Sequence, residues 1–189
     1  AAYQRLGRSD EAQQLRNEAA SLSPTQAKLD EATRLFVKGQ FRESEKLAQE
    51  LVRENPHDVN AALLLARLAM MANCYEDARE ILERIVDKQP RFIAAWHDLG
   101  TVLKECHEYE EAVAILEKAL TLEPENALTH YYHGAALAMA ARPAEAVESY
   151  EKAVGIDPEL PGAHIGLGHV LKTVGDQEGG IAAYRRAID

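Results

Sequence analysis

Four prolines recur at one fixed spacing, and this spacing constrains the fold more than any other feature of the chain. Pro56, Pro90, Pro124 and Pro158 each lie 34 residues from the next. A fixed period between about 20 and 50 residues is typical of proteins built from stacked repeats. Each repeat is one supersecondary unit that buries its apolar face only by stacking on its neighbours. Because such a stack presents a long continuous surface, the period favours a binding function over catalysis.

Two further positions of this period are always small when the repeats are taken to begin at residues 25, 59, 93, 127 and 161. The eighth residues of the repeats are Ala32, Ala66, Gly100, Gly134 and Gly168. The twentieth residues are Ser44, Ala78, Ala112, Ala146 and Gly180. Small residues allow the backbones of two packed helices to approach closely. The pattern therefore predicts two antiparallel helices per repeat that cross at these positions.

The third of these repeats carries a set of residues that resembles the tetratricopeptide-repeat (TPR) pattern. The matching residues are Trp96, Leu99, Gly100, Leu103, Ala112, Leu116, Ala119 and Pro124. The resemblance extends over essentially the whole chain. It implies an all-α fold in which helical hairpins form a solenoid that winds into a right-handed superhelix.

The repeat boundaries follow from this register. We expect a partial repeat at 1–24 that keeps its second helix, full repeats at 25–58, 59–92, 93–126 and 127–160, and a repeat at 161–189 truncated at its C-terminal end. The predicted helices are 9–22, 25–38, 42–55, 59–72, 76–88, 93–106, 110–122, 127–140, 144–156, 161–174 and 178–188. Since both ends fall within a repeat, we expect the chain to be a fragment of a longer array.

Charge and composition exclude several classes of partner. The chain has 21 basic and 31 acidic residues and a formal net charge of −10. An acidic surface repels phosphate backbones and anionic membranes, so we expect neither nucleic acid nor a membrane as a partner. No apolar run is long enough to span a bilayer, and we expect a cytoplasmic location. The two cysteines, Cys74 and Cys106, show no disulfide or metal-binding spacing.

No motif for catalysis, a cofactor or a metal is present. Glycine-rich phosphate loops, the nucleophile elbow and the His-Glu-x-x-His zinc motif are all missing. His130 and His164 occupy the repeat position of Trp96, and His133 occupies that of Leu99. We therefore expect these three histidines to be packing residues and not metal ligands. The chain itself is not expected to be an enzyme.

The resemblance also implies where a ligand lies. In TPR arrays the first helices of the repeats line a concave groove, to which they contribute six positions per repeat. The candidate groove residues are Leu63, Leu64, Arg67, His97, Asp98, Thr101, Lys104, Tyr131, Tyr132, His169 and Lys172, with Met71, Met139 and Ile165 beside them. A protein or peptide is the expected ligand. The alternative for Tyr131 or Tyr132 is that the ring packs between repeats.

Two ligand-binding devices of TPR families are absent at the matching positions: the lysine/asparagine clamp for a terminal carboxylate, and the asparagine ladder.

The segments Gly168–Gly175 and Gly180–Ile188 resemble the last repeat of bacterial proteins in which a TPR array precedes a sulfotransferase domain. The hypothesis is thus a recognition arm of such an enzyme, and the alternative is a free-standing adaptor. A catalytic or metal-binding unit is the third, least favoured reading. We also expect self-association through the terminal helix, where Ile181, Tyr184 and Ile188 recur at helical spacing.

Overall fold

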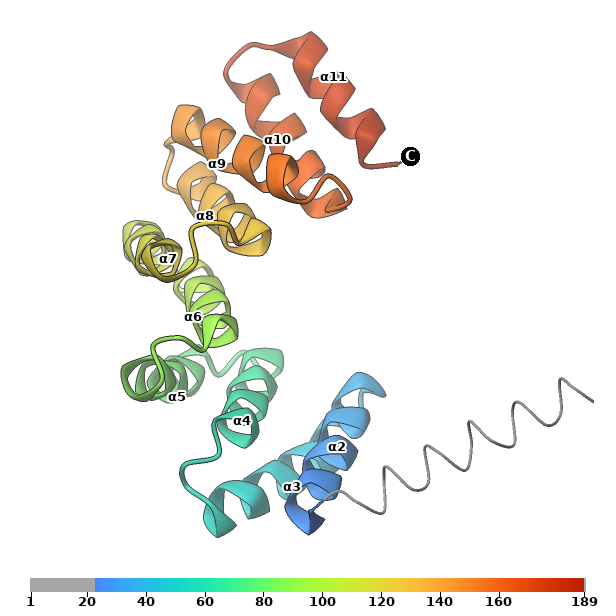
Figure 1. The fold of residues 1–189 in the computed structure, drawn as a ribbon, viewed down its shortest axis with the longest axis vertical. Coiled ribbons are helices and arrows are strands. Elements are labelled where there is room, and N and C mark those ends of the chain that lie inside the picture. Colours follow the sequence, from blue (N-terminus) through green and yellow to red (C-terminus); the bar gives the residue numbers. More distant parts are fainter. Residues whose placement is uncertain (1–22, 189) are drawn as a thin grey trace, which may run out of the picture. The chain divides into compact units, whose positions relative to one another are not determined.

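The computed structural model describes residues 23–188, and every regular element in this range is an α-helix (Figure 1). The helices are α2 (Pro24–Val37), α3 (Phe41–Glu54), α4 (Val59–Met71), α5 (Tyr75–Lys88), α6 (Ile93–Glu105), α7 (Tyr109–Leu122), α8 (Ala127–Met139), α9 (Pro143–Ile156), α10 (Pro161–Thr173) and α11 (Gln177–Arg186). Each begins and ends within two residues of its expected bounds, which confirms the all-α prediction. The helix expected at 9–22, and with it nearly all of the partial repeat at 1–24, lies outside the described residues.

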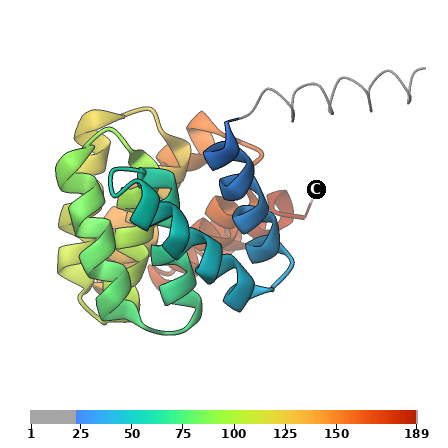
Figure 2. The same ribbon diagram turned by 90° about the horizontal axis from the view of Figure 1, so that it is seen from below.

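The chain divides into two compact units at Leu68 and Ala69, which we describe separately. In the first unit, α2, α3 and most of α4 surround one apolar core. Its buried members are Leu29, Ala32, Ala48, Leu51, Ala61, Leu64 and Leu68. In the second unit, consecutive helices from α5 to α11 pack against each other as hairpins, as both views show (Figures 1 and 2). Leu82, Leu99, Leu103, Leu116 and Leu137 are fully buried there.

The first helix of every repeat ends in the same way. The second residue after each of these helices has a positive φ, and these five residues are spaced at the 34-residue period: Gly39, Asn73, His107, Ala141 and Gly175. The next N–H group then donates back to a carbonyl five residues earlier, as Glu108 does to Leu103 and Arg142 does to Leu137, both at 2.9 Å. This is the Schellman motif, which satisfies the carbonyl groups left over at a helix end. The turn between the two helices of a repeat is thus set by backbone geometry.

The two small positions of the period lie where the helices of one repeat cross. A Cβ atom added to Gly100 would lie 2.9 Å from Leu116 Cδ1, and one added to Gly168 would lie 2.7 Å from Tyr184 Cε1. At the twentieth position, the Ser44 hydroxyl donates to the Ala32 carbonyl oxygen at 2.8 Å. Contacts this short leave no room for larger side chains, which is the reason predicted for the pattern.

In the Gly179–Gly180 pair, Gly180 occupies the small twentieth position of its repeat, and Gly179 has a separate role. Asp176 caps α11, because its Oδ1 accepts a hydrogen bond from Gly179 N at 2.9 Å. A Cβ atom at residue 179 would lie 2.2 Å from Asp176 Oδ2. Glycine at this position therefore makes room for the capping carboxylate, which sequence spacing alone does not reveal.

Candidate peptide-binding surface

The first helices of successive repeats are neighbours in the second unit. Helix α6 contacts α8, and α8 contacts α10, so equivalent positions on these three helices form one surface (Figure 1). This surface carries the candidate groove residues from His97 to Lys172. The three candidates on α4 belong to the first unit, which ends at Leu68.

The structure places two of the three α4 candidates in the interior. Leu63 and Leu64 are only 7% and 6% exposed, and Leu64 belongs to the core of the first unit. Arg67 is half-buried. These two expected groove residues are therefore core residues, because a helix with apolar residues on consecutive positions buries more than one face.

His97 also lies in the interior, where it connects α6 to α8. Its Nε2 atom lies 2.7 Å from the Thr129 hydroxyl, and its ring centroid lies 5.0 Å from that of Tyr132. The Thr101 hydroxyl donates to the His97 carbonyl oxygen at 3.0 Å. Asp98 is half-buried beside them. This part of the expected groove consists of contacts between repeats, with little side-chain surface left for a ligand.

The two tyrosines of α8 lie in different environments. Tyr131 packs between repeats, as in the alternative interpretation, because its ring fills the space above Gly162 and lies 6.1 Å from the Tyr150 ring. A Cβ atom on Gly162 would lie 3.2 Å from Tyr131 Cε2. Tyr132 is half-buried between Tyr131 and His97. The rings therefore form a continuous row that stiffens the surface.

The remaining candidates are accessible. Met139 and Ile165 are 52% and 44% exposed, and His169 and Lys172 are exposed on α10. His169 Nδ1 lies 2.9 Å from the Tyr184 hydroxyl. Lys104 is partly exposed on α6, with its Nζ atom 3.2 Å from Glu105 Oε1. The open part of the surface thus mixes apolar and cationic side chains and runs from the end of α6 to α10.

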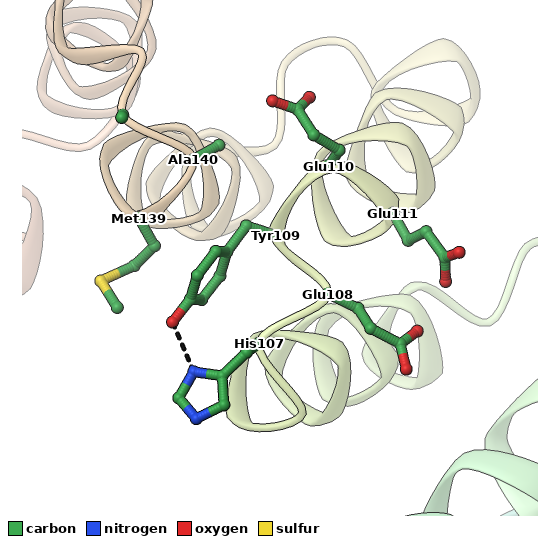
Figure 3. Close-up of a pocket in the computed structure, with 8 residues that line it drawn as sticks. His107, Glu108, Tyr109, Glu110, Glu111, Met139 and Ala140 are labelled. Atoms are coloured by element: carbon green, nitrogen blue, oxygen red, sulfur yellow. Dashed lines mark hydrogen bonds between the residues drawn. The ribbon is translucent and has the colours of Figure 1, made fainter.

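Two hollows adjoin this surface near the end of α8. The inner hollow, of about 300 Å³, is lined by Lys104, Glu105, His107, Tyr109, Ala135, Ala138, Met139 and Tyr150. The outer hollow, of about 410 Å³, is lined by His107, Glu108, Tyr109, Glu110, Glu111, Met139, Ala140 and Ala141 (Figure 3). Sequence reasoning did not place His107, Tyr109 and the three glutamates at the groove, because it drew groove candidates only from the first helices. The available signal was the 34-residue spacing of the left-handed turns, since the turn residues His107 and Ala141 both line the outer hollow.

Among the described residues, no group of three or more histidine, cysteine, aspartate or glutamate side chains could hold a metal ion. His130 and His164 are buried, and His133 is mostly buried. Burial lowers the pKa of His133 to about 4, so this side chain is neutral at pH 7. Cys74 and Cys106 are free thiols, and the pKa of Cys106 is raised by burial and nearby glutamates. A raised pKa is the opposite of what activates a thiol as a nucleophile, so Cys106 lacks that feature.

Comparison with known proteins agrees with the repeat architecture. Two family models, both described as tetratricopeptide repeat, match residues 35–103 and 97–161. No curated protein sequence matches the chain at a significant level. None of the helices at residues 24–186 is both long enough and apolar enough to cross a membrane.

Solved structures share the fold at low sequence identity. TTC0263, a TPR protein of Thermus thermophilus, aligns with a TM-score of 0.77 and 21% identity over 87% of this chain and 90% of that one. MamA from Desulfovibrio magneticus RS-1 aligns with a TM-score of 0.72 and 20% identity over 87% of this chain and 93% of that one. Another MamA structure gives a TM-score of 0.69 and 22% identity, covering 83% and 92% of the two chains.

Proposed function

The chain is an array of tetratricopeptide repeats, and on this premise we propose that it is a scaffold that binds a protein or peptide partner. The proposed binding surface is the exposed part of the face formed by α6, α8 and α10. Its members are Lys104, Tyr132, Met139, Ile165, His169 and Lys172.

One observation carries this proposal. Large apolar side chains remain open on first helices that are otherwise closely packed, with Met139 at 52% and Ile165 at 44% exposure. The same helices carry the half-buried rings of Tyr131 and Tyr132, which are already held by contacts with rings of neighbouring helices. Rigid aromatic and apolar groups bind a partner at a low cost in conformational entropy. Metal or acid–base chemistry has no comparable support among the described residues.

The comparisons favour a free-standing adaptor over the recognition arm of a sulfotransferase. The chain covers at least 90% of the solved TTC0263 and Desulfovibrio MamA chains, so these solved chains consist almost entirely of the same fold. Neither the family models nor these relatives connect the chain to a sulfotransferase. The resemblance of the last repeat to sulfotransferase-linked arrays is the remaining support for that hypothesis. Calorimetry with the phosphoadenosine-phosphosulfate donor should show no binding to this chain.

The binding proposal is tested with a random dodecapeptide library panned on the purified chain. Retained peptides should lose most of their affinity for Ile165→Glu, which places a charge in the proposed surface. The control is Ile156→Glu, because Ile156 is 37% exposed but lies on α9, a second helix. Equal affinity for both variants, or no retained peptide at all, would contradict the proposal.

We also propose that the chain self-associates through α11. The exposed apolar surface there is smaller than the set of Ile181, Tyr184 and Ile188 that the sequence indicated. Tyr184 does not point outward: it packs on Gly168 and hydrogen-bonds His169. Ile181 and Ile188 are 49% and 86% exposed, so these two residues form the open face. In sedimentation experiments, Ile181→Glu with Ile188→Glu should shift any dimer toward monomer. A wild-type chain that is monomeric at high concentration would rule this association out.

A further inference from the structure

The inner and outer hollows share a wall made by three side chains: His107, Tyr109 and Met139. The Tyr109 hydroxyl lies 2.6 Å from His107 Nδ1, and the two rings meet edge to face at 5.7 Å. Figure 3 shows the Tyr109 ring between His107 and Met139, and the glutamates extending from the other side of the turn. A bound peptide that extends from the surface of α6 and α8 toward this turn therefore contacts the side chains of the shared wall first and the carboxylates next.

The inner hollow is suited to an apolar side chain. Ala135 and Ala138 are half-buried, and their small side chains leave the space open between Met139 and Tyr150. Tyr150 is 4% exposed, so its ring is a fixed wall. A volume of about 300 Å³ is at the lower end of the range of small ligand pockets. It is large enough for one aliphatic or aromatic side chain but not for a folded element.

The outer hollow has an acidic rim without a lysine or arginine among its lining side chains. The carboxylates around it outnumber the nearby cations. Arg79 pairs with Glu83, Glu108 and Glu111, and Arg142 pairs with Glu110 and Glu145, so that five carboxylates share two guanidinium groups. The hydrogen bond and charge of Glu108 raise the pKa of Glu111, and both carboxylates pair with the same Arg79 guanidinium group. An additional cation would relieve this crowding.

We propose that the two hollows together bind one protein segment, in which an apolar side chain enters the inner hollow and an arginine or lysine a few residues away enters the outer hollow. This inference rests on the proposed function and specifies its ligand as an apolar–basic peptide. It also extends the binding surface beyond the first helices, to the turn at 107–108 and the first residues of α7 at 109–111.

The long cationic side chains match the outer hollow in two ways. The aliphatic part of a lysine or arginine side chain covers the apolar surface of Met139 and Tyr109. Its charged end then lies among the polar glutamates. A guanidinium or ammonium group beside the Tyr109 ring also gains a cation–π interaction. An anionic segment is disfavoured by the same carboxylates, and the net charge of −10 attracts basic partners from a distance.

The test uses fluorescein-labelled peptides with a glycine–serine background, in which one leucine and one arginine are separated by varied numbers of residues. Matched peptides carry citrulline in place of arginine, or glycine in place of leucine. The leucine–arginine peptides should bind best, and ¹⁵N-resolved spectra should shift at residues 107–111 and 139–141. Citrulline peptides that bind equally well, or shifts confined to other residues, would overturn the inference.

Two variants probe the two hollows. Met139→Lys places a cation in the shared wall, and Ala138→Leu fills the inner hollow; each should weaken binding roughly tenfold or more. Met71→Lys is the control for the first, because Met71 has the same repeat position and is 55% exposed, against 52% for Met139. Ala114→Leu, at an exposed position of α7, is the control for the second.

The outcomes separate this inference from the proposed function. If library peptides are sensitive to Ile165→Glu but not to Met139→Lys or Ala138→Leu, the chain binds peptides on α10 and the inference fails. If neither the library nor the leucine–arginine peptides bind, both fail. If added salt and Met139→Lys weaken the same arginine-containing peptides while Met71→Lys does not, the inference is supported.

Discussion

The imidazole of His164 binds the carbonyl group of Pro158, with Nε2 and the oxygen 2.9 Å apart. His130 makes the same contact with Pro124 at 2.8 Å, and the indole N–H of Trp96 makes it with Pro90 at 2.7 Å. In their own repeats, His130 and His164 thus take the place of the tryptophan as the N–H donor. The acceptor is the carbonyl group of the proline near the end of the preceding repeat. This contact connects the two most regular features of the sequence, the proline period and the Trp96 position.

The first prediction concerns this donor. His130 and His164 each leave a buried Nδ1 atom without a hydrogen-bond partner, whereas an indole has no second nitrogen. His164 also lines a cavity of about 650 Å³, which gives a larger ring some room. His164→Trp should therefore be more stable than His164→Phe, which has no donor, by about 1–2 kcal/mol. Urea unfolding of the two variants measures the difference, and equal midpoints would mean that the contact to Pro158 is not stabilising.

The second prediction concerns the left-handed turns. Ala141 has a φ of 58°, a conformation that costs roughly 1 kcal/mol for a residue with a Cβ atom and nothing for glycine. Ala141→Gly should therefore stabilise the chain by up to about 1 kcal/mol. Ala140→Gly is the control, because Ala140 has a φ of −75° and gains nothing from glycine. A destabilising Ala141→Gly would show that the turn is not strained.

The third prediction concerns pH. The folded pKa of His133 is about 4, below its ordinary value of 6.5, so the unfolded chain binds more protons between these values. Stability should therefore fall as the pH drops from about 6.5 to about 4, by as much as about 3 kcal/mol. Burial is the main cause of the lowered pKa, and the charges of His130, Arg142 and Lys152 act in the same direction, against Glu145. Glu117 lies 3.9 Å from His133 Nε2 and would partly compensate a charged ring.

The matched variant for this prediction is His133→Leu combined with Ser149→Ala. Leucine stands at the equivalent positions 99 and 167, and Ser149 Oγ, 2.9 Å from His133 Nδ1, would otherwise lose its partner. The loss of stability in this pH interval should be clearly smaller in the double variant. Identical pH profiles for the variant and the wild type would exclude His133 as the cause.

The fourth prediction concerns the small positions. A Cβ atom on Gly134 would already lie 3.1 Å from the Tyr150 ring, and Ala146 is completely buried. Gly134→Leu or Ala146→Leu should destabilise the chain by roughly 1–3 kcal/mol through overpacking. Gly155→Ala is the control: it has no neighbour within 4 Å and should gain up to about 1 kcal/mol of helix propensity. Unchanged denaturation midpoints for both leucine variants would contradict the assigned repeat register.

The sequence by itself determined the repeat, the helices and the crossing points. These follow from local rules that recur in every repeat: a proline at each 34-residue interval, apolar residues at helical spacing, and small residues where two backbones meet. The packing role of His130, His133 and His164 could also be read from their register with Trp96 and Leu99. Repetition makes such features predictable, because the same kind of residue at the same position of several repeats supports one assignment of helices and turns.

Only the tertiary structure decided which side chains remain open. Leu63, Leu64 and His97 have the register of groove residues but are buried, and Tyr184 turns toward α10 and away from solvent. The hollows around Tyr109 and Met139 join residues about 30 positions apart, on different repeats. A periodic sequence specifies the backbone of each repeat, but the exposure of a side chain depends on the particular residues of the adjoining helices. Those contacts differ from one repeat to the next, so the period cannot encode them.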